Sequence, residues 1–318
     1  MNKHAYLVMA HHQFPLLQTT LRLLDDPRND FFIHIDKKAG AVDLEEIRRA
    51  APHSRVTFIE RLSVHWGGYS QIRCELALLQ AATQAGQYAY YHLISGVDLP
   101  LRTAAEIHTF FDAHPDREYV HFASLCPAEP ICRRISQYHF FMGKSRKSRF
   151  CRGLERLLEG TQSLFGVDRL RKSGLHLAFG AQWFSITDDL ARYVLCRRRW
   201  IAHHFRFGDC ADELFLQTLV ANSPFFQRTH AVLAGLPDGD YRAVARNIDW
   251  TRGQPYVWRS EDLSALLASD FCFARKFDLD IDAGTVQVVA RRLTVRGEKT
   301  WDACYFPAAF LQEKDLHF

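Results

Sequence analysis

The chain has 318 residues, of which 47% are hydrophobic and 24% charged, and its formal net charge is +4. This composition excludes a disordered chain and a dedicated nucleic-acid-binding domain, and it provides enough apolar material for one large α/β domain or two small ones. No stretch reaches the roughly eighteen apolar residues that a membrane-spanning helix needs.

Strands and helices alternate in the first third of the chain. The apolar run 6–10 is typical of a strand buried on both faces of a parallel sheet, and a proline-initiated helix follows it. The alternation continues with a strand at 30–36, a helix at 44–50, a strand at 56–59, a helix at 71–85 and a strand at 90–95. This order predicts a Rossmann-like sheet whose ligand site lies at the carboxyl ends of the strands, where His11, His34 and Asp36 fall.

Two further features of this part bear on ligand binding. Gly67 and Gly68 precede the helix at 71–85, and paired glycines before a helix let a ligand approach the backbone closely. Because no Gly-x-Gly-x-x-Gly or Walker pattern is present, neither a dinucleotide-binding fold nor a P-loop is supported. Asp98, which follows the strand at 90–95, has two equal interpretations: a functional acid at a strand end, or a residue that caps a turn.

The segment 124–175 is basic and irregular, and its best-formed helix is predicted at 154–165. A helix at 104–114 and a strand at 118–122 precede it. An insertion of this size in a compact domain is often functional. We expect it to contact either an acidic acceptor or an anionic membrane surface, and a solvated basic face is an equal alternative.

The centre of the chain holds the strongest candidate for chemistry. The run 180–186 predicts a short buried strand, and Asp209 is a suitable N-cap for a helix whose first turn carries Asp212 and Glu213. On that helix Glu213 shares a face with apolar residues such as Leu216, and desolvation there would suit a general base. The alternative is that both acids complement the helix dipole.

The remaining segments predict a helix at 263–269 and, from the alternation of Val286, Val288 and Leu293, a terminal hairpin or edge strand. The acidic run 278–282 reads as a solvated turn or strand edge. One domain is the simplest partition. Its predicted parts are a nucleotide-binding half (1–123), a basic helical insertion (124–175) and an acceptor half with the C-terminal segment (176–318).

The cysteines and histidines do not predict a metal centre. Eight cysteines show neither a Cys-x-x-Cys pair nor a zinc spacing, which indicates free thiols in a reducing compartment and favours a cytoplasmic location. The histidine pairs 11–12 and 203–204 are poor metal sites, because adjacent histidines point in different directions and no third ligand stands at a useful spacing.

Eight runs, in order, resemble one family. They are Leu-Val-Met-Ala-His-His, Ile-His-Ile-Asp-Lys, Trp-Gly-Gly-Tyr-Ser, Leu-Ile-Ser-Gly-Val-Asp-Leu-Pro-Leu, Gly-Ala-Gln-Trp-Phe-Ser-Ile, Asp-Glu-Leu-Phe, Asn-Ile-Asp-Trp and Ala-Arg-Lys-Phe-Asp. Between about Ala5 and Asp282 the chain is similar to the core-2/I-branching β-1,6-N-acetylglucosaminyltransferases and the peptide O-xylosyltransferases, glycosyltransferase family 14.

The resemblance implies a GT-A-like fold and an inverting transferase that uses a UDP-sugar without a metal ion or other cofactor. It implies that Glu213 is the catalytic base. On the donor side it implies roles for three residues near the uridine: His11, Asp36 and Trp66. In the family, two fixed cations balance the negative charge of the departing diphosphate. The resemblance matches this pair to Arg259 and Lys276, with Arg275 as a rival for the first position.

On the acceptor side, the resemblance implies Trp250 and, from a looser alignment, Glu106, while Arg252 stands where animal members have tyrosine. The chain resembles the bacterial branch, whose members sit in the cytosol and often build surface polysaccharides. We therefore expect N-acetylglucosamine or xylose as the donor sugar, a glycan or lipid-linked glycan as the acceptor, and peripheral contact of the insertion with the inner face of the membrane. The alternatives are a metal-dependent transferase using Asp36 or Asp98, and a non-catalytic protein that binds sugars or anions.

Overall fold

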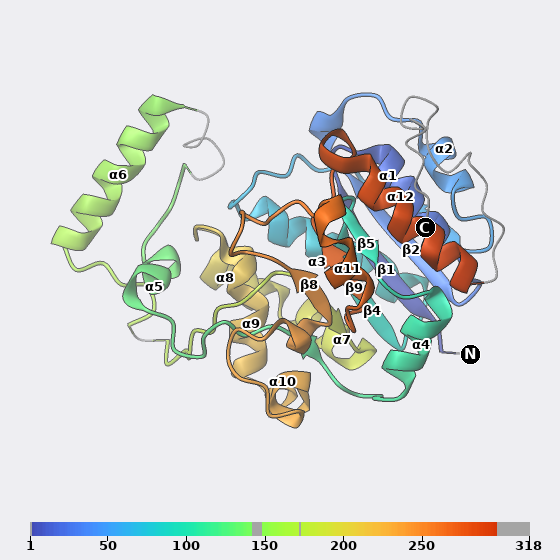
Figure 1. Ribbon diagram of the computed structural model, residues 1–318. Coiled ribbons are helices and arrows are strands. Elements are labelled where there is room, and N and C mark those ends of the chain that lie inside the picture. Colours follow the sequence, from blue (N-terminus) through green and yellow to red (C-terminus); the bar gives the residue numbers. More distant parts are fainter. Residues whose placement is uncertain (1, 142–147, 172, 298–318) are drawn as a thin grey trace.

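A computed structural model describes residues 2–141, 148–171 and 173–297, and its centre is a six-stranded sheet (Figure 1). The strand order is β3-β2-β1-β4-β7-β6. The strands are β1 (His4–Ala10), β2 (Asn29–Ile35), β3 (Arg55–Phe58), β4 (Tyr90–Ser95), β6 (Tyr119–Val120) and β7 (Phe184–Ile186). The first four run parallel, and β7 is antiparallel to both of its neighbours. The predicted mostly parallel α/β sheet is therefore confirmed.

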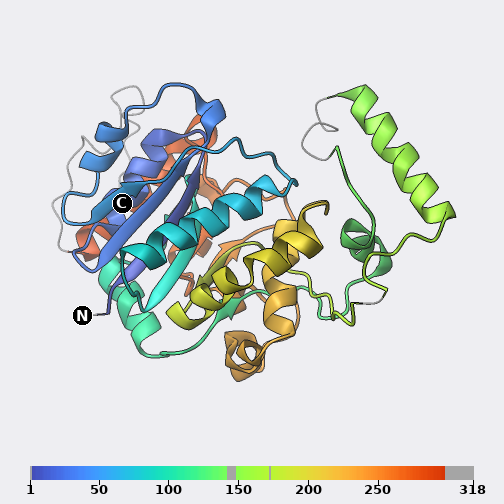
Figure 2. The same ribbon diagram turned by 180° about the vertical axis from the view of Figure 1, so that it is seen from behind.

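Both faces of the sheet are covered, because successive side chains of each central strand enter different cores. Ala5 and Leu7 of β1 pack into one core, with α3 (Ser70–Ala85), α7 (Asp188–Cys196) and α9 (Phe215–Ala221). Figure 2 shows α3 lying along this face. The alternate residues Tyr6 and Val8 pack into the other core, with α1 (Phe14–Leu24), α2 (Leu44–Arg49) and α4 (Ala104–Asp112).

A second, three-stranded sheet was not predicted from the sequence. It has the order β5-β9-β8, formed by β5 (Asp98–Pro100), β9 (Phe273–Arg275) and β8 (Arg246–Ile248). β5 follows β4 after only two residues, and a Cβ atom on Gly96 in that turn would lie 2.9 Å from the Cβ of Ala10. The carboxyl ends of β4 and β1 therefore lie in close contact, and β5 carries the chain from the main sheet to the small one.

The predicted terminal hairpin is wrong, because the segment forms the helix α12 (Leu279–Arg296), shown beside α1 in Figure 1. Its buried residues Val286, Val289, Ala290 and Leu293 follow helical spacing, which the alternation of valines concealed. The acidic run is the beginning of this helix, where Asp278 is the N-cap and accepts a hydrogen bond from the backbone of Asp280.

The insertion contains α5 (Glu129–Ser136) and α6 (Arg149–Leu164), and Figure 1 shows α6 standing well apart from the sheet. The other helices are α8 (Arg198–Phe205), α10 (His230–Leu233) and α11 (Leu263–Leu267). Among the described residues, no helix combines the length and the apolar character needed to cross a bilayer. The division of the chain into three parts stays a prediction.

Candidate active site

A cavity of about 470 Å³ lies where the central segment meets the small sheet. Its lining combines two carboxylates, two cations and three tryptophans. The lining residues are Trp66, Ala181, Gln182, Trp183, Cys210, Asp212, Glu213, Trp250, Gln254, Pro255, Arg275 and Lys276. These come from five separated stretches of sequence, so the cavity exists only in the folded chain.

Backbone hydrogen bonds hold residues 209–213, the segment that carries the two carboxylates, in place. The Gly67 carbonyl accepts a hydrogen bond of 2.8 Å from the Cys210 N–H, which brings the loop of Trp66 to this segment. The Gly180 N–H donates to the Glu213 carbonyl at 3.0 Å. A Cβ on Gly180 would lie only 1.9 Å from the His121 carbonyl oxygen, so this position accepts no larger residue without backbone movement. The expected helix start differs from the structure, because residues 211–213 form a 3-10 turn and α9 begins at Phe215, leaving Asp209 outside any N-cap.

Glu213 lies at the cavity wall in an ion pair with Arg134 of α5. The Arg134 Nη2 atom is 2.8 Å from Glu213 Oε2. The same guanidinium donates to the carbonyls of Asp209 and Cys210 at 3.0 and 2.6 Å. Arg134 therefore fixes both the carboxylate and the backbone that carries it.

Asp212, for which the sequence offered only a role in complementing the helix dipole, is buried beside Glu213. Burial, followed by the charge of Glu213, raises the pKa of Asp212 to about 7. Its Oδ2 atom accepts a hydrogen bond of 3.0 Å from Gln71. Gln182, which lines the cavity, donates to Glu75 Oε1 at 3.2 Å, and burial raises the pKa of Glu75 well above its ordinary value. A buried network of acids and amides thus supports the carboxylate side of the cavity.

The lining of the cavity also includes the cations Arg275 and Lys276. In the antiparallel pair of β5 and β9, Asp98 lies opposite Arg275, and Arg275 Nη1 is 2.9 Å from Asp98 Oδ1. The guanidinium also stacks over the Trp183 ring, with its Cζ atom 4.4 Å from the ring centroid. Across the described part of the chain, the Lys276 ammonium has neither an ion-pair nor a hydrogen-bond partner. Asp98 therefore positions Arg275, and the adjacent Lys276 is available to an anionic ligand.

Two of the three tryptophans leave their rings accessible to a ligand. Trp66 is 60% exposed and Trp250 45% exposed, although both line the cavity. Exposed aromatic faces of this size are suited to stacking against a sugar ring or a nucleobase. Together the lining offers carboxylates, fixed positive charge and flat apolar faces, which is a set suited to group transfer from an anionic leaving group.

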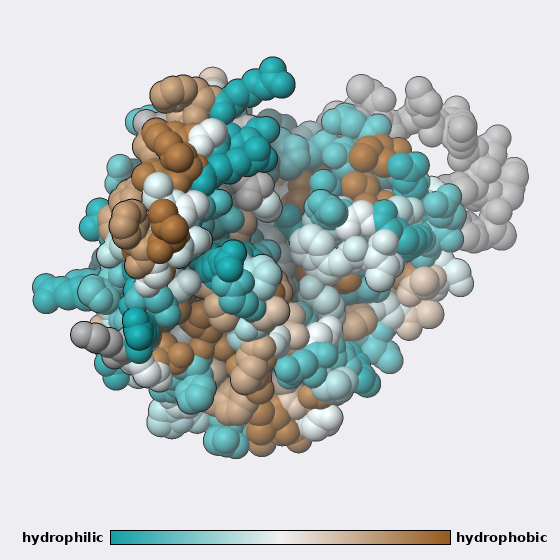
Figure 3. All heavy atoms as spheres, turned by 90° about the vertical axis from the view of Figure 1, so that its left-hand side faces the viewer, coloured by the Kyte–Doolittle hydropathy of each residue, from teal (hydrophilic) through white to brown (hydrophobic). Residues whose placement is uncertain are grey.

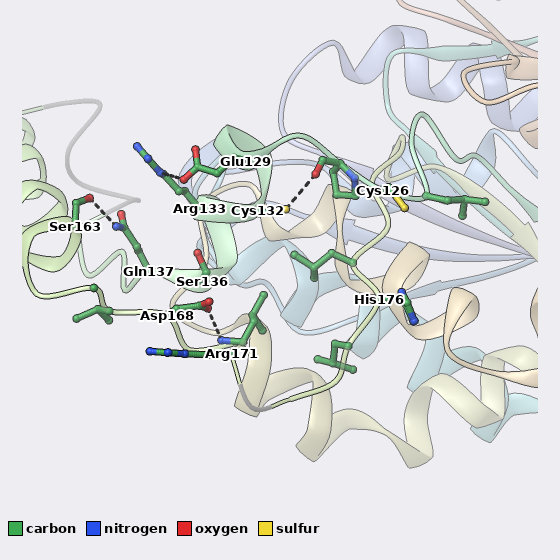
Figure 4. Close-up of a pocket in the computed structure, with 17 residues that line it drawn as sticks. Cys126, Glu129, Cys132, Arg133, Ser136, Gln137, Ser163, Asp168, Arg171 and His176 are labelled. Atoms are coloured by element: carbon green, nitrogen blue, oxygen red, sulfur yellow. Dashed lines mark hydrogen bonds and ion pairs between the residues drawn. The ribbon is translucent and has the colours of Figure 1, made fainter.

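A larger cavity of about 570 Å³ lies in the insertion, between α5 and the segment that follows α6 (Figure 4). Several of its polar side chains are engaged with near neighbours. Arg133 pairs with Glu129, and Gln137 donates to Ser163 Oγ at 2.9 Å. Its lining contains none of the residues that the sequence singled out for chemistry, unlike that of the cavity beside Glu213.

The profile of the core-2/I-branching enzymes matches residues 4–264. The chain belongs to this family. It is 23% identical to β-1,3-galactosyl-O-glycosyl-glycoprotein β-1,6-N-acetylglucosaminyltransferase of Bos taurus, over 93% of this chain and 70% of that protein. It is also 23% identical to xylosyltransferase 2 of Canis lupus familiaris, where 90% of this chain matches 33% of the longer protein. Mouse xyloside xylosyltransferase 1, in its apo crystal structure, aligns with 86% of this chain and 97% of its own, with a TM-score of 0.39 and 12% identity.

Family membership confirms the resemblance, and this core-2/I-branching enzyme is a glycosyltransferase. Of the residues that the sequence singled out, the structure brings four to the cavity: Glu213, Trp66, Trp250 and Lys276. Two lining residues, Asp212 and Arg275, had only a secondary place in the sequence interpretation. Arg134, in the insertion, was missed. Its sole sequence signal was its place within a basic segment.

Arg259 is not brought to the cavity. Its side chain is exposed, and its N–H donates to Asp262 Oδ2 at 3.0 Å at the start of a 3-10 turn. The neighbouring Trp258 is buried and donates to the Arg275 carbonyl at 2.9 Å, which directs the two consecutive side chains differently. Arg275, and not Arg259, therefore lines the cavity together with Lys276.

Glu106 also lies outside the cavity, in the first turn of α4. It forms a capping box with Thr103, accepting from the Thr103 N–H at 2.8 Å, and it pairs with Arg296 of α12. These contacts give it a role in holding two helices together. Arg252, at the position of the family's tyrosine, is likewise engaged, pairing with Asp249 and Asp262 at 2.6 Å each.

His11 and Asp36 lie together at the carboxyl ends of β1 and β2, outside the lining of the cavity. The Asp36 N–H donates to the Ala10 carbonyl at 2.8 Å, and the Asp36 carboxylate accepts from the Val64 N–H at 3.2 Å. The His11 ring stacks on His12, with 4.1 Å between centroids, and partial burial together with His12 lowers the pKa of His11. Both residues stand at the edge where a Rossmann-like sheet binds its ligand.

Proposed function

We propose that this chain is an inverting, metal-independent transferase that moves N-acetylglucosamine or xylose from a UDP-sugar to a hydroxyl of a glycan or lipid-linked glycan. The observation that carries the proposal is that one cavity is lined by the carboxylate of Glu213 together with the cations Arg275 and Lys276. The relatives named above transfer N-acetylglucosamine or xylose, which supports these two donors.

In the proposed reaction, Glu213 accepts the proton of the acceptor hydroxyl as its oxygen bonds to the sugar C1. The bond between C1 and the diphosphate oxygen breaks at the same time, and UDP leaves with that electron pair. Arg275 and Lys276 stabilise the charge that develops on the diphosphate, a task that a metal ion performs in other transferases. The engagement of Asp98 with Arg275 supports this assignment, because it removes Asp98 from the set of free metal ligands.

A donor screen tests the function directly. UDP-GlcNAc, UDP-xylose, UDP-GalNAc and UDP-glucose would be offered to the purified chain, with hydrolysis and transfer measured with and without EDTA. We expect one of the first two donors to be preferred and EDTA to have no effect on turnover. Loss of turnover in EDTA that added Mn²⁺ or Mg²⁺ restores would instead support a metal-dependent transferase. Transfer retained in Glu213→Gln would show that the base is assigned wrongly, and UDP binding without any transfer by the unmodified chain would favour a binding protein.

We also propose that the enzyme works at the cytosolic face of a bacterial membrane, in surface-polysaccharide synthesis, and that α6 contacts the bilayer. α6 presents Phe150, Leu157 and Leu164 to solvent, with exposures of 79%, 63% and 81%. Figure 3 faces this side and shows hydrophobic side chains gathered beside hydrophilic ones. Arg149 and Arg156 lie along one side of this apolar stripe on the helical wheel, and a basic, amphipathic helix of this kind lies in the interface of anionic membranes.

Vesicle flotation tests the membrane contact. We expect the chain to float with phosphatidylglycerol vesicles and not with phosphatidylcholine vesicles. Leu157→Ser combined with Phe150→Ser should abolish flotation, and Val295→Ser, which removes an exposed apolar side chain from α12, should not. If the stripe instead joins two copies of the chain, the double variant would change the sedimentation coefficient in the absence of lipid.

A further inference from the structure

The face that α6 turns toward the rest of the protein is polar, not apolar. Glu155 on this face is 4% exposed, and His139, in the segment between α5 and α6, is 8% exposed. Glu159 lies one turn further along the same face, since residues four apart on a helix are neighbours. Buried carboxylates are costly unless they are compensated, so the contact between α6 and the connecting segment requires an explanation.

The hydrogen bonds fix which ring nitrogen of His139 carries a proton. His139 Nε2 lies 3.1 Å from the Arg133 carbonyl oxygen, which can only accept, so Nε2 is the donor. In the neutral ring, His139 Nδ1 therefore holds a lone pair. That lone pair faces Glu155 Oε1 at 3.2 Å and Glu159 Oε1 at 3.4 Å. Three electron-rich atoms thus converge on one point, and a positive charge must lie between them.

The separations of these atoms match the edges of a metal coordination tetrahedron. With zinc–nitrogen and zinc–oxygen bonds of about 2.0–2.2 Å, tetrahedral ligands lie about 3.3–3.5 Å apart. In the described part of the chain, His139, Glu155 and Glu159 are the one group of three such side chains whose ligand atoms all lie within 4.8 Å of one another. A single proton on His139 Nδ1 would point well at one carboxylate only, whereas a metal ion satisfies both.

The outer contacts are also those of a metal site. A metal-bound histidine donates its other ring N–H to a carbonyl or carboxylate, as His139 does to Arg133. Glu155 Oε2 accepts a hydrogen bond of 3.0 Å from the Phe141 N–H, which orients Oε1 toward His139. Two of the three ligands are buried and Glu159 is part-exposed, which leaves room for water at a fourth position.

We propose that His139, Glu155 and Glu159 bind one Zn²⁺ ion that fastens α6 to the segment after α5. Mixed nitrogen and carboxylate ligands suit zinc, which accepts four-coordinate geometry without redox change. This metal would be structural. It lies in the insertion, apart from the cavity that holds Glu213, and it is independent of the proposed metal-free transfer.

Zinc content tests the proposal, on the full chain without an affinity tag. The protein would be stripped with EDTA, dialysed against micromolar free zinc and assayed by mass spectrometry of the metal. We expect about one zinc ion more per chain in the unmodified protein than in Glu159→Gln, whose side chain is part-exposed, so that the variant should fold normally. His139→Gln should lose the same ion. His203→Gln, which removes an exposed histidine of α8, serves as the matched control and should retain it.

A second readout does not depend on counting metal. Zinc at roughly 100 times its dissociation constant should raise the thermal midpoint of the unmodified chain by roughly 5 °C, and leave that of Glu159→Gln unchanged. Equal zinc content in the unmodified chain, Glu159→Gln and His139→Gln would overturn the proposal and leave an imidazolium between two carboxylates. Neither measurement uses a sugar donor, so the metal site and the proposed transferase reaction stand or fall separately.

Discussion

Arg134 and Glu213, 79 residues apart in sequence, form an ion pair of 2.8 Å at the wall of the candidate active site. The pair joins the basic insertion to the proposed catalytic base. Arg134 also donates to two backbone carbonyls of the segment that precedes the base. The insertion therefore contributes to the position of the base, in addition to any contact with acceptor or membrane.

Replacing Arg134 by alanine should lower kcat by about 100-fold and change the KM for the donor little, because a misplaced base slows the proton transfer without removing donor contacts. Steady-state kinetics would measure both constants. The matched control is Arg133→Ala, the adjacent arginine that pairs with Glu129, which should have nearly the kcat of the unmodified enzyme. A large rise in KM with unchanged kcat would instead place Arg134 in donor binding.

Asp212→Asn should remove part of the pH dependence of stability. The pKa of Asp212 is raised to about 7 by burial and by Glu213, so the folded chain holds this proton more tightly than the unfolded chain. The free energy of unfolding therefore falls as pH rises from about 4 to 7, by at most about 4 kcal/mol.

Urea unfolding at about pH 5 and about pH 8 would measure this difference. We expect Asp212→Asn to be the more stable protein at the higher pH, with a smaller difference between the two conditions. Asp209→Asn, a nearby acid that is not fully buried, should follow the unmodified chain. A decrease in stability of the asparagine variant at the higher pH would contradict the assigned direction.

Lys276→Met should reduce turnover by about 100-fold or more, because it removes fixed positive charge from the leaving group in a site where such charge is effective. Arg259→Met is the control, since that side chain lies outside the cavity, and it should keep most of the activity. The same assay with both variants decides between the two positions. If Arg259→Met were the more damaged enzyme, the diphosphate would lie elsewhere than proposed.

Replacing each of the two exposed tryptophans should change the KM of a different substrate. Trp66→Ala should raise the donor KM, and Trp250→Ala the acceptor KM, each by roughly 5- to 100-fold, if each ring provides about 1–3 kcal/mol of stacking. Bisubstrate kinetics with a preferred donor would measure the two constants in one experiment. Each variant is the control for the other, and an equal effect of both on the donor alone would remove Trp250 from the acceptor side.

The first third of the fold was predictable because long apolar runs alternate there with amphipathic helices. The strands β5 and β9 were not, since three residues are too few to show a period, and their pairing depends on contacts between distant segments. At the candidate site, Glu213 was found from its motif. The inward position of Asp212 was missed because a 3-10 turn replaces the expected α-helical turn and changes which side chain faces the interior.

Arg133 and Arg134, at consecutive positions of α5, contact two different parts of the protein. The carbonyl of Arg133 accepts from His139, and the guanidinium of Arg134 holds Glu213. A chimera whose foreign 124–175 segment lacks an arginine at position 134 would lose the partner of Glu213. Engineering of acceptor preference should therefore keep α5 and graft only the residues beyond it.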